Sequence, residues 1–290
     1  MIKQLKDMAG TTENNQIAYL PEGIIKNIQE RIRIDKFTPL QEKVFNSEKF
    51  WNQKKNLIIQ GTTSSGKTLI AEVAAAHCIF SSAERMNVIY LVPLRAMVSE
   101  KYKQFTQDMG QGRYAWNIYA SSSDYQNSDR EIMDGDFHLA VIVYEKFFSL
   151  LAQSSRDFLA ECGLVIVDEI QMLSDSNRGP KLEFSLTKLK QYFPNAQIMG
   201  LTTIYCDTKE IGEWLDAENI TDPLRTVDLY ENIVIEDGTC ITKIETAQQG
   251  KVEKNIVDDD RLKNFIETRD NKKKQNLGKN SRKQNLMFNI

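Results

Sequence analysis

One segment of the sequence has the residue pattern that cradles the phosphates of a nucleotide. An apolar run ending at Gln60 leads into a loop of the form G-x-x-x-x-G-K-[ST], and a helical pattern follows. The loop residues are Gly61, Thr62, Thr63, Ser64, Ser65, Gly66, Lys67 and Thr68. Glycine lets the backbone approach closely, the Lys67 ammonium neutralises the outer phosphates, and the Thr68 hydroxyl can ligate Mg²⁺. A chance serine-rich turn is the alternative, but strand, loop and helix in this order favour phosphate binding.

Two adjacent carboxylates, Asp168 and Glu169, follow the apolar run 164–167. Ligands of open α/β sheets bind at the carboxyl ends of the strands. We therefore expect Asp168 to hold Mg²⁺ and Glu169 to polarise an attacking water. A helix cap is the alternative use of such a pair. Together with the phosphate loop, the pair predicts three catalytic residues, Lys67, Asp168 and Glu169, and two metal ligands, Thr68 and Asp168.

The elements that must position these residues form an alternating pattern. From about residue 56 to residue 204, short runs rich in Val, Ile and Leu alternate with longer helical patterns. Such alternation predicts an α/β domain whose mainly parallel sheet is flanked by helices. The expected strands are 56–60, 88–92, 116–119, 139–143, 164–167 and 197–201.

The flanks of this core suggest further segments. Apolar residues at helical spacing predict a helix over 22–34, and the pair Asp237-Gly238 predicts a hairpin turn. The tail has many Lys and Asn residues, which predicts disorder; it is either a solvated terminus or a nonspecific phosphate-binding segment. We divide the chain into an N-terminal segment 1–20, a core domain 21–230, a hairpin and helical extension 231–270, and a basic tail 271–290.

Composition narrows the function classes. Hydrophobic residues make up 41% of the 290 residues and the net charge is -3, so the chain can fold but lacks a generally basic surface. No apolar run reaches the about 18 residues that a bilayer requires, and no signal peptide is recognised. We expect no membrane partner and a cytoplasmic protein, or a nuclear one in a eukaryote.

The cysteines do not form a metal-ligand motif. They are widely separated, and only His77 and His138 could join them as ligands. Structural thiols are therefore expected at Cys78, Cys162, Cys206 and Cys240.

The residues around the two motifs resemble the superfamily two DExH-box helicases, in particular the branch of archaeal DNA-repair helicases and exosome-associated RNA helicases. The most specific stretch is 90–102, which reads YLVPLRAMVSEKY. The segment 37–41 resembles the one whose glutamine recognises adenine, which implies that Gln41 contacts ATP; an ordinary helix start is the alternative. By this resemblance the chain is an ATP hydrolase of helicase type, with a RecA-like P-loop fold and with ATP and Mg²⁺ as cofactors.

The resemblance also implies contacts with the backbone of single-stranded DNA or RNA. The implied residues are Pro93, Arg95, Ser123, Glu145 and Lys146. A strand that ends in a proline turn, with a cation beside a helix N-terminus, suits phosphate and reads no base. Ser123 stands where the family has glycine, which alters how closely the backbone can approach.

Two departures concern the coupling of the nucleotide to strand movement. Gln171 stands where this branch has histidine, and glutamine cannot take up a proton near neutral pH. The family's Ser-Ala-Thr motif is replaced by Thr202, Thr203 and Ile204. We therefore expect coupling to be altered more than ATP binding.

The resemblance covers about residues 20 to 240, which corresponds to the first RecA-like domain. No glycine- and arginine-rich motif follows Ile204. Such a motif supplies an arginine finger worth about three to five powers of ten in rate. We expect a second RecA-like domain in a longer or separate chain; the alternative is a degenerate module that binds ATP or nucleic acid without efficient hydrolysis of its own.

Overall fold

The computed structural model falls into two compact units, Met1–Leu224 and Arg225–Ile290. It describes residues 37–52, 55–81, 86–109, 116–153, 159, 161–203, 207–227, 229–234, 239–245 and 252–258. The helix predicted over 22–34 and the basic tail 271–290 lie outside the described residues. The boundary predicted at residues 230 and 231 and the division after Leu224 are close together.

The first unit is built on a seven-stranded sheet in the order β3-β4-β2-β5-β6-β1-β7. Every pair of neighbouring strands is parallel. The strands are β1 (Asn56–Gly61), β2 (Asn87–Val92), β3 (Ile118–Ser121), β4 (Leu139–Val143), β5 (Cys162–Asp168), β6 (Gln197–Thr202) and β7 (Ala217–Asp222). The predicted α/β domain with a mainly parallel sheet is confirmed.

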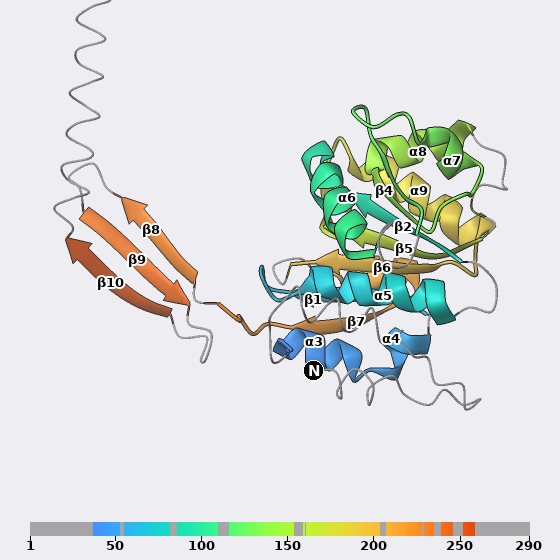
Figure 1. The fold of residues 1–290 in the computed structure, drawn as a ribbon. Helices are drawn as coiled ribbons and strands as arrows, with labels where there is room; N and C mark the ends of the chain where they lie inside the picture. Colours follow the sequence, from blue (N-terminus) through green and yellow to red (C-terminus); the bar gives the residue numbers. More distant parts are fainter. Residues whose placement is uncertain are drawn as a thin grey trace, which may run out of the picture. The chain divides into compact units, whose positions relative to one another are not determined.

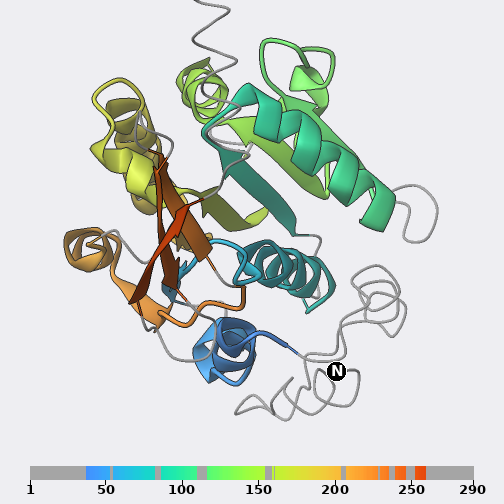
Figure 2. The same cartoon turned by 90° about the vertical axis from the view of Figure 1, so that its left-hand side faces the viewer.

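Helices cover both faces of this sheet (Figures 1 and 2). One face carries α3 (Pro39–Phe45), α4 (Glu48–Asn52), α5 (Lys67–Ser81) and α6 (Arg95–Met109). The other carries α7 (Asp129–Met133), α8 (Tyr144–Gln153), η2 (Ile170–Ser174), α9 (Gly179–Tyr192) and α10 (Lys209–Leu215). Among the described residues, no helix combines the length and apolar character needed to cross a bilayer.

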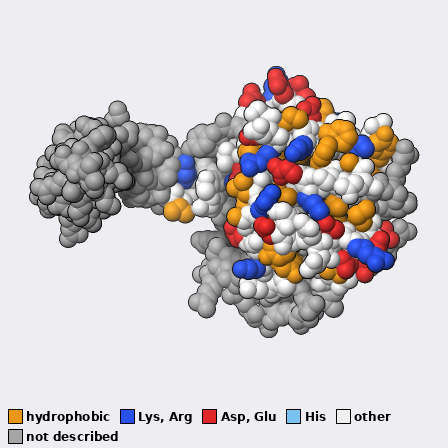
Figure 3. All heavy atoms as spheres, turned by 90° about the horizontal axis from the view of Figure 1, so that it is seen from above, with side chains coloured by type: hydrophobic (Ala, Val, Ile, Leu, Met, Phe, Trp, Pro, Cys, Tyr) orange, Lys and Arg blue, Asp and Glu red, His pale blue; other side chains and the backbone are white. Residues whose placement is uncertain are grey.

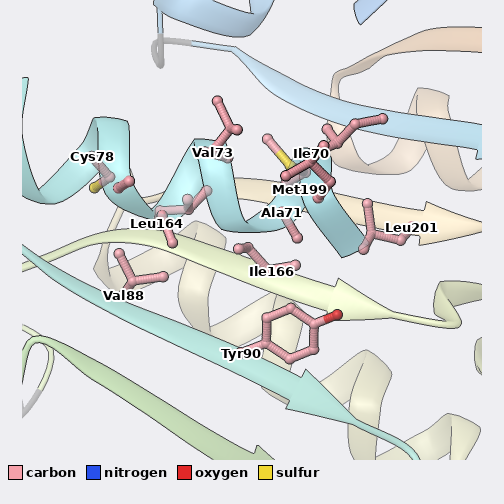
Figure 4. Close-up of a cluster of buried hydrophobic side chains, with 14 of the residues drawn as sticks. Ile70, Ala71, Val73, Cys78, Val88, Tyr90, Leu164, Ile166, Met199 and Leu201 are labelled. Carbon is pink, nitrogen blue, oxygen red and sulfur yellow. The ribbon is translucent and has the colours of Figure 1, made fainter. Parts of the chain in front are cut away.

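The core lies in two apolar layers, one on each side of the sheet. Along β2, Val88 and Tyr90 face the layer beneath α5, while Ile89 and Leu91 face the opposite layer, because successive side chains of a strand point to opposite faces. Figure 4 shows the first layer, in which Ile70 and other residues of α5 pack over β5 and β6. Strands buried on both faces explain the continuous apolar runs in the sequence.

The strand predictions differ most from the structure at β3 and β7, while β1, β2, β5 and β6 extend one or two residues beyond their predicted bounds. β3 begins at Ile118 rather than residue 116, because the carbonyl oxygen of Asn117 accepts from the backbone N–H groups of both His138 and Leu139 before the regular ladder starts. The edge strand β7 was not predicted. Its sequence AENITD has no apolar run, since an edge strand with only Ile220 and Asp222 buried needs none.

The second unit contains a three-stranded antiparallel sheet in the order β10-β9-β8. Its strands are β8 (Leu229–Val234), β9 (Thr239–Glu245) and β10 (Val252–Asp258). The hairpin predicted around Asp237-Gly238 is confirmed by the pairing of β8 with β9, although the turn itself lies outside the described residues. The third strand, β10, was not predicted.

Candidate nucleotide and nucleic-acid site

The residues predicted to do chemistry follow the carboxyl ends of six strands of the parallel sheet. The phosphate loop follows β1, the acidic pair lies at the end of β5, and the coupling residues lie at the end of β6. The residues predicted to contact nucleic acid follow β3, β4 and β2. Because the sheet order is β3-β4-β2-β5-β6-β1, the predicted nucleic-acid contacts lie on one half of the carboxyl edge and the predicted nucleotide contacts on the other. We call these the nucleic-acid half and the nucleotide half; they meet between β2 and β5.

The phosphate loop has the strained backbone that close phosphate binding requires. Ser64 and Gly66 both have positive φ angles, 65° and 86°. Helix α5 begins at Lys67, so its first N–H groups and its positive dipole end face the loop. The Ser65 hydroxyl donates to the Thr62 carbonyl oxygen at 2.7 Å, which closes the turn.

Lys67 folds back over this loop. Its Nζ donates to the carbonyl oxygens of Gly61 at 2.9 Å and Thr62 at 2.8 Å. Burial lowers the pKa of Lys67, and the negative charges of Glu169 and Asp168 oppose that shift. The ammonium therefore lies within the field of the acidic pair, and it makes bonds to loop carbonyls that a bound phosphate would have to replace.

Gln41 clamps the phosphate loop. The segment before α3 forms a capping box, in which the Thr38 hydroxyl accepts from the Gln41 N–H and the Gln41 side chain accepts from the Thr38 N–H. The Gln41 amide also donates to the Gly66 carbonyl oxygen at 3.2 Å, and Thr38 Oγ1 donates to the Ser65 carbonyl oxygen at 2.7 Å. The helix-start interpretation is thus correct, and the segment also holds the loop. A contact with adenine stays a prediction.

Asp168 lies at the end of β5 and is only 9% exposed. Its Oδ2 accepts from the Tyr90 hydroxyl at 2.9 Å. Burial raises the pKa of Asp168, opposed chiefly by the positive charge of Lys101 and then by the Tyr90 hydrogen bond. A buried carboxylate compensated by nearby cations and donors is suited to binding a metal cation.

Glu169 adopts the left-handed conformation, with φ 57° and ψ 49°. It stands at the N-cap position of η2, yet its side chain makes no capping hydrogen bond. The helix-cap alternative for this acid is therefore wrong. Its carboxylate accepts from the Gln171 side-chain amide instead.

Gln171 links the acidic pair to the end of β6. Its Nε2 donates to Glu169 Oε2, and its Oε1 accepts from the Thr202 hydroxyl at 2.6 Å. Thr203 contributes a backbone contact, since its carbonyl oxygen accepts from the Gln60 amide at 3.2 Å. Ile204 lies outside the described residues. Glutamine and threonine therefore form a continuous hydrogen-bonded link between the two motifs.

Two tyrosines and a lysine belong to the site but were not assigned to it from sequence. The Tyr90 hydroxyl, which points towards the carboxyl ends of the strands in Figure 4, reaches Asp168 from β2. The Tyr144 hydroxyl donates to the carbonyl oxygens of Asp168 and, at 3.4 Å, Glu169. Sequence spacing could have indicated that Lys101 is buried, because it falls on the apolar face of α6 between Val98 and Phe105.

The magnesium ligands predicted from sequence fit such an ion chemically. Thr68 and Asp168 supply oxygen atoms, the donors that Mg²⁺ prefers. The ammonium of Lys101 donates to Thr68 Oγ1 at 3.1 Å, and its charge also acts on Asp168. A cationic group is therefore already accommodated beside both expected ligands.

The nucleic-acid half contains the remaining predicted residues. Arg95 is exposed and begins α6, directly after the buried Pro93 and the exposed Leu94. Ser123 is exposed between β3 and α7. Arg95 and Ser123 are therefore open to a ligand on this edge.

The other two residues are ion-paired in the first turn of α8. Lys146 Nζ lies 2.5 Å from Asp129 Oδ2, and Glu145 Oε1 lies 3.4 Å from Arg178 Nε. Figure 3 shows basic side chains interspersed with acidic ones on the face that it presents. A phosphate that binds Lys146 would therefore compete with Asp129.

Two of the four cysteines lie among the described side chains, and both are buried free thiols. Burial raises the pKa of Cys78 to about 12, and it also raises the pKa of Cys162. Both therefore remain thiols near neutral pH, as expected for structural residues.

A parallel sheet with a phosphate loop after one strand and an acidic pair two strands away defines a P-loop nucleotidase with a RecA-like fold. The particular family follows from comparison. Residues 38–208 match the model of the DEAD/DEAH box helicases, and the chain belongs to this family. The matched domain is the N-terminal RecA-like domain of superfamily two helicases.

Similar proteins agree with this assignment. The ATP-dependent DNA helicase Hel308 of Methanocaldococcus jannaschii is 38% identical over 192 residues, which cover 64% of this chain and 15% of that protein. The Hel308 of Methanococcus vannielii is 32% identical over 218 residues, which cover 73% of this chain and 28% of that protein. The chain thus spans less than a third of the length of either relative.

Solved structures share the fold. The helicase Lhr of Mycobacterium smegmatis, bound to single-stranded DNA and AMP-PNP, superposes with a TM-score of 0.61 at 21% identity, covering 75% of this chain and 30% of that one. A hypothetical ATP-dependent RNA helicase from Sulfolobus tokodaii gives a TM-score of 0.53 at 18% identity, covering 69% of this chain and 57% of that one.

Proposed function

We propose that this chain carries the first motor lobe of an ATP-dependent helicase, which binds ATP with Mg²⁺ and the backbone of a single nucleic-acid strand. The observation that carries the proposal is the divided carboxyl edge of the sheet. The nucleotide motifs follow β5, β6 and β1, and the strand-contact motifs follow the adjoining β3, β4 and β2. A ligand on each half would lie beside the other, as a motor that couples the two requires.

At the nucleotide half, the loop N–H groups and Lys67 would hold the phosphates. Thr68 and Asp168 would hold Mg²⁺, which when bound neutralises phosphate charge. Glu169 would polarise the attacking water, and Gln171 would keep its carboxylate oriented, since the amide already donates to it. Gln41 would contribute to nucleotide affinity through the loop as well as through adenine.

At the nucleic-acid half, Arg95 would contact phosphate beside the N-terminus of α6. Pro93, Ser123, Glu145 and Lys146 complete the proposed contacts. The relatives named as DNA helicases favour DNA as the strand, but backbone contacts alone discriminate poorly between DNA and RNA.

Efficient hydrolysis would need a second RecA-like domain, in a longer or separate chain. The relatives are several times longer than the matched region. An arginine finger from such a domain raises the rate by about three to five powers of ten.

The decisive experiment measures ATP turnover by the chain, with and without a second-domain protein, in the presence of oligo(dT), oligo(rU) or no nucleic acid. We expect slow turnover that rises with one or both strands and with the second domain. The control is Lys67→Ala. Turnover that never exceeds this control under any condition would refute the hydrolase proposal.

The alternative is a degenerate module that binds ATP or nucleic acid without efficient hydrolysis. The replacement of the family's coupling motif by Thr202, Thr203 and Ile204 favours it. Nucleotide binding that depends on Lys67, combined with no turnover even beside a second domain, would support this alternative. Strong strand-stimulated hydrolysis would exclude it.

A further inference from the structure

Lys101 is a buried cation at the junction of the two halves. Only 6% of its surface is exposed, although it belongs to α6, which begins with the exposed Arg95. A buried lysine is unfavourable unless a polar or charged partner compensates it. Its Nζ donates to Thr68 Oγ1 at 3.1 Å, so its partner is a side chain of the nucleotide site.

A second polar contact joins the same two helices about one turn further along. The Gln104 amide of α6 donates to Glu72 Oε1 of α5, and Glu72 is 1% exposed. Thr68 and Glu72 are four residues apart on α5, while Lys101 and Gln104 are three apart on α6, so each pair lies on one helix face. Two partly buried polar contacts thus join α6 to α5, in addition to the apolar packing of α6.

The position of Lys101 brings it into conflict with a bound magnesium ion. Thr68 is one of the two proposed ligands, and the charge of Lys101 acts on the other, Asp168. An ammonium group held by Thr68 Oγ1 and a divalent cation ligated by Thr68 and Asp168 would repel each other at short range, in a site where burial weakens solvent screening. A metal ion bound by Thr68 would therefore favour displacement of the Lys101 ammonium from Thr68 Oγ1.

Movement of Lys101 would reach the nucleic-acid half through α6. Arg95 and Lys101 are six residues apart, which corresponds to about 9 Å along a helix axis. Because a helix moves largely as one body, a displacement of α6 at Lys101 would also displace Arg95. Release of the contact with Thr68 removes one of the two polar contacts described between α5 and α6.

We propose that Lys101 is a positioning residue that competes with Mg²⁺ for the oxygen atoms of the nucleotide site, so that binding of magnesium nucleotide releases α6 and moves Arg95. This inference rests on the proposed function. It assigns the coupling of the two sites to α6, whereas the link made by Gln171 and Thr202 joins two motifs within the nucleotide half.

The test uses Lys101→Met in the full chain, which keeps the aliphatic stem and removes the charge. Lys101→Gln is the second variant, because it also retains a donor. Lys103→Met is the matched control, since Lys103 is exposed on the same helix. Affinity for a fluorescent ATP analogue is measured in EDTA and across a Mg²⁺ titration. Affinity for labelled oligo(dT) and oligo(rU) is measured with and without magnesium AMP-PNP.

We expect both Lys101 variants to lower the Mg²⁺ concentration needed for tight nucleotide binding by about fivefold or more, with little change in EDTA. The effect of magnesium nucleotide on oligonucleotide affinity should shrink towards none, while Lys103→Met behaves as wild type. A Mg²⁺ midpoint that stays within about twofold of wild type in a folded Lys101 variant would overturn the inference. So would an equal change in EDTA and in Mg²⁺, which indicates a purely structural role. Absence of nucleotide binding by the wild-type chain would instead reject the proposed function, and the inference with it.

Discussion

Gln171 connects two motifs through its single side-chain amide. It donates to Glu169 and accepts from the buried Thr202 hydroxyl at 2.6 Å. We predict that Gln171→Ala and Thr202→Val each lower the free energy of unfolding by about 1 kcal/mol, because each removes this shared hydrogen bond. The double variant should be less destabilised than the sum, by about 0.5 to 1.5 kcal/mol. Urea unfolding of all four proteins measures this.

Thr187 supplies the control for that cycle. It is exposed on α9, and its hydroxyl donates only to the Glu183 carbonyl oxygen among the contacts described. Thr187→Val should combine additively with Gln171→Ala. If Thr202→Val also combines additively with Gln171→Ala, the hydrogen bond between Gln171 and Thr202 does not contribute to stability as predicted.

We expect His77 to give the fold a dependence on pH. Its Nε2 lies 3.0 Å from the Trp51 carbonyl oxygen, and its ring packs edge-on against the Trp51 ring at 5.0 Å. Burial lowers its pKa below the usual 6.5, opposed by the backbone hydrogen bond. Below the unfolded-state pKa, the unfolded chain takes up a proton that the folded one resists. Stability from this residue is therefore present above about pH 6.5 and is lost as pH falls, by at most about 1.4 kcal/mol per pH unit.

We predict that His77→Gln, which keeps a donor at a similar reach, destabilises the protein at pH 8 but reduces the further loss between pH 7 and pH 5.5. Thermal unfolding of both proteins across this range is the measurement. Parallel curves for wild type and variant would show that His77 does not titrate as stated.

Among the strands, the sequence predicted those whose burial produces a regular local pattern of apolar residues. The bounds of β4 are those predicted, 139–143, because a strand buried on both faces is a continuous apolar run. β7 has no such run, because as an edge strand it is buried mainly through pairing with β1. The phosphate loop and the acidic pair were likewise found from local pattern, whereas the nucleic-acid contacts, Gln41 and the coupling residues came from the family resemblance. Contacts such as those of Tyr90 and Tyr144 with Asp168 depend on the order of strands β4-β2-β5, which local pattern does not determine.

The phosphate loop requires a glycine at position 66. Gly66 has a φ of 86°, and a Cβ there would lie 2.0 Å from the Gln41 amide nitrogen. Gly135 has a similar φ of 73°, but a Cβ there would meet nothing within 4 Å. The two glycines thus share a backbone requirement and differ in crowding.

We predict that Gly135→Ala costs about 1 to 2 kcal/mol of stability, since only the left-handed backbone is penalised. Gly66→Ala should cost more and weaken nucleotide binding by about tenfold or more, because it displaces Gln41 from the loop. Urea unfolding and titration with a fluorescent ATP analogue measure the two effects. Equal nucleotide affinity in both variants would mean that the clamp by Gln41 does not shape the loop.

The whole molecule consists of two compact units, and the division between them falls after Leu224. The nucleotide half of the site reaches this boundary, because the Thr62 hydroxyl donates to the Leu224 carbonyl oxygen at 3.2 Å and the Leu224 N–H donates to Asp222 at 2.8 Å. A chain that ends at Val227 keeps these contacts. One that ends at Asp222 loses the Leu224 carbonyl that Thr62 uses.

We therefore predict that the chain 1–227 keeps the thermal midpoint of the first unit within about 2 °C and retains nucleotide affinity. The reason is that the seven-stranded sheet and the described site residues all lie within these residues. The chain 1–222 should unfold at a lower temperature and bind nucleotide more weakly, since Thr62 in the phosphate loop loses its partner. Calorimetry and titration with a fluorescent ATP analogue compare the two. If 1–227 is as impaired as 1–222, the second unit contributes to the stability of the first, and the division after Leu224 does not separate independent folding units.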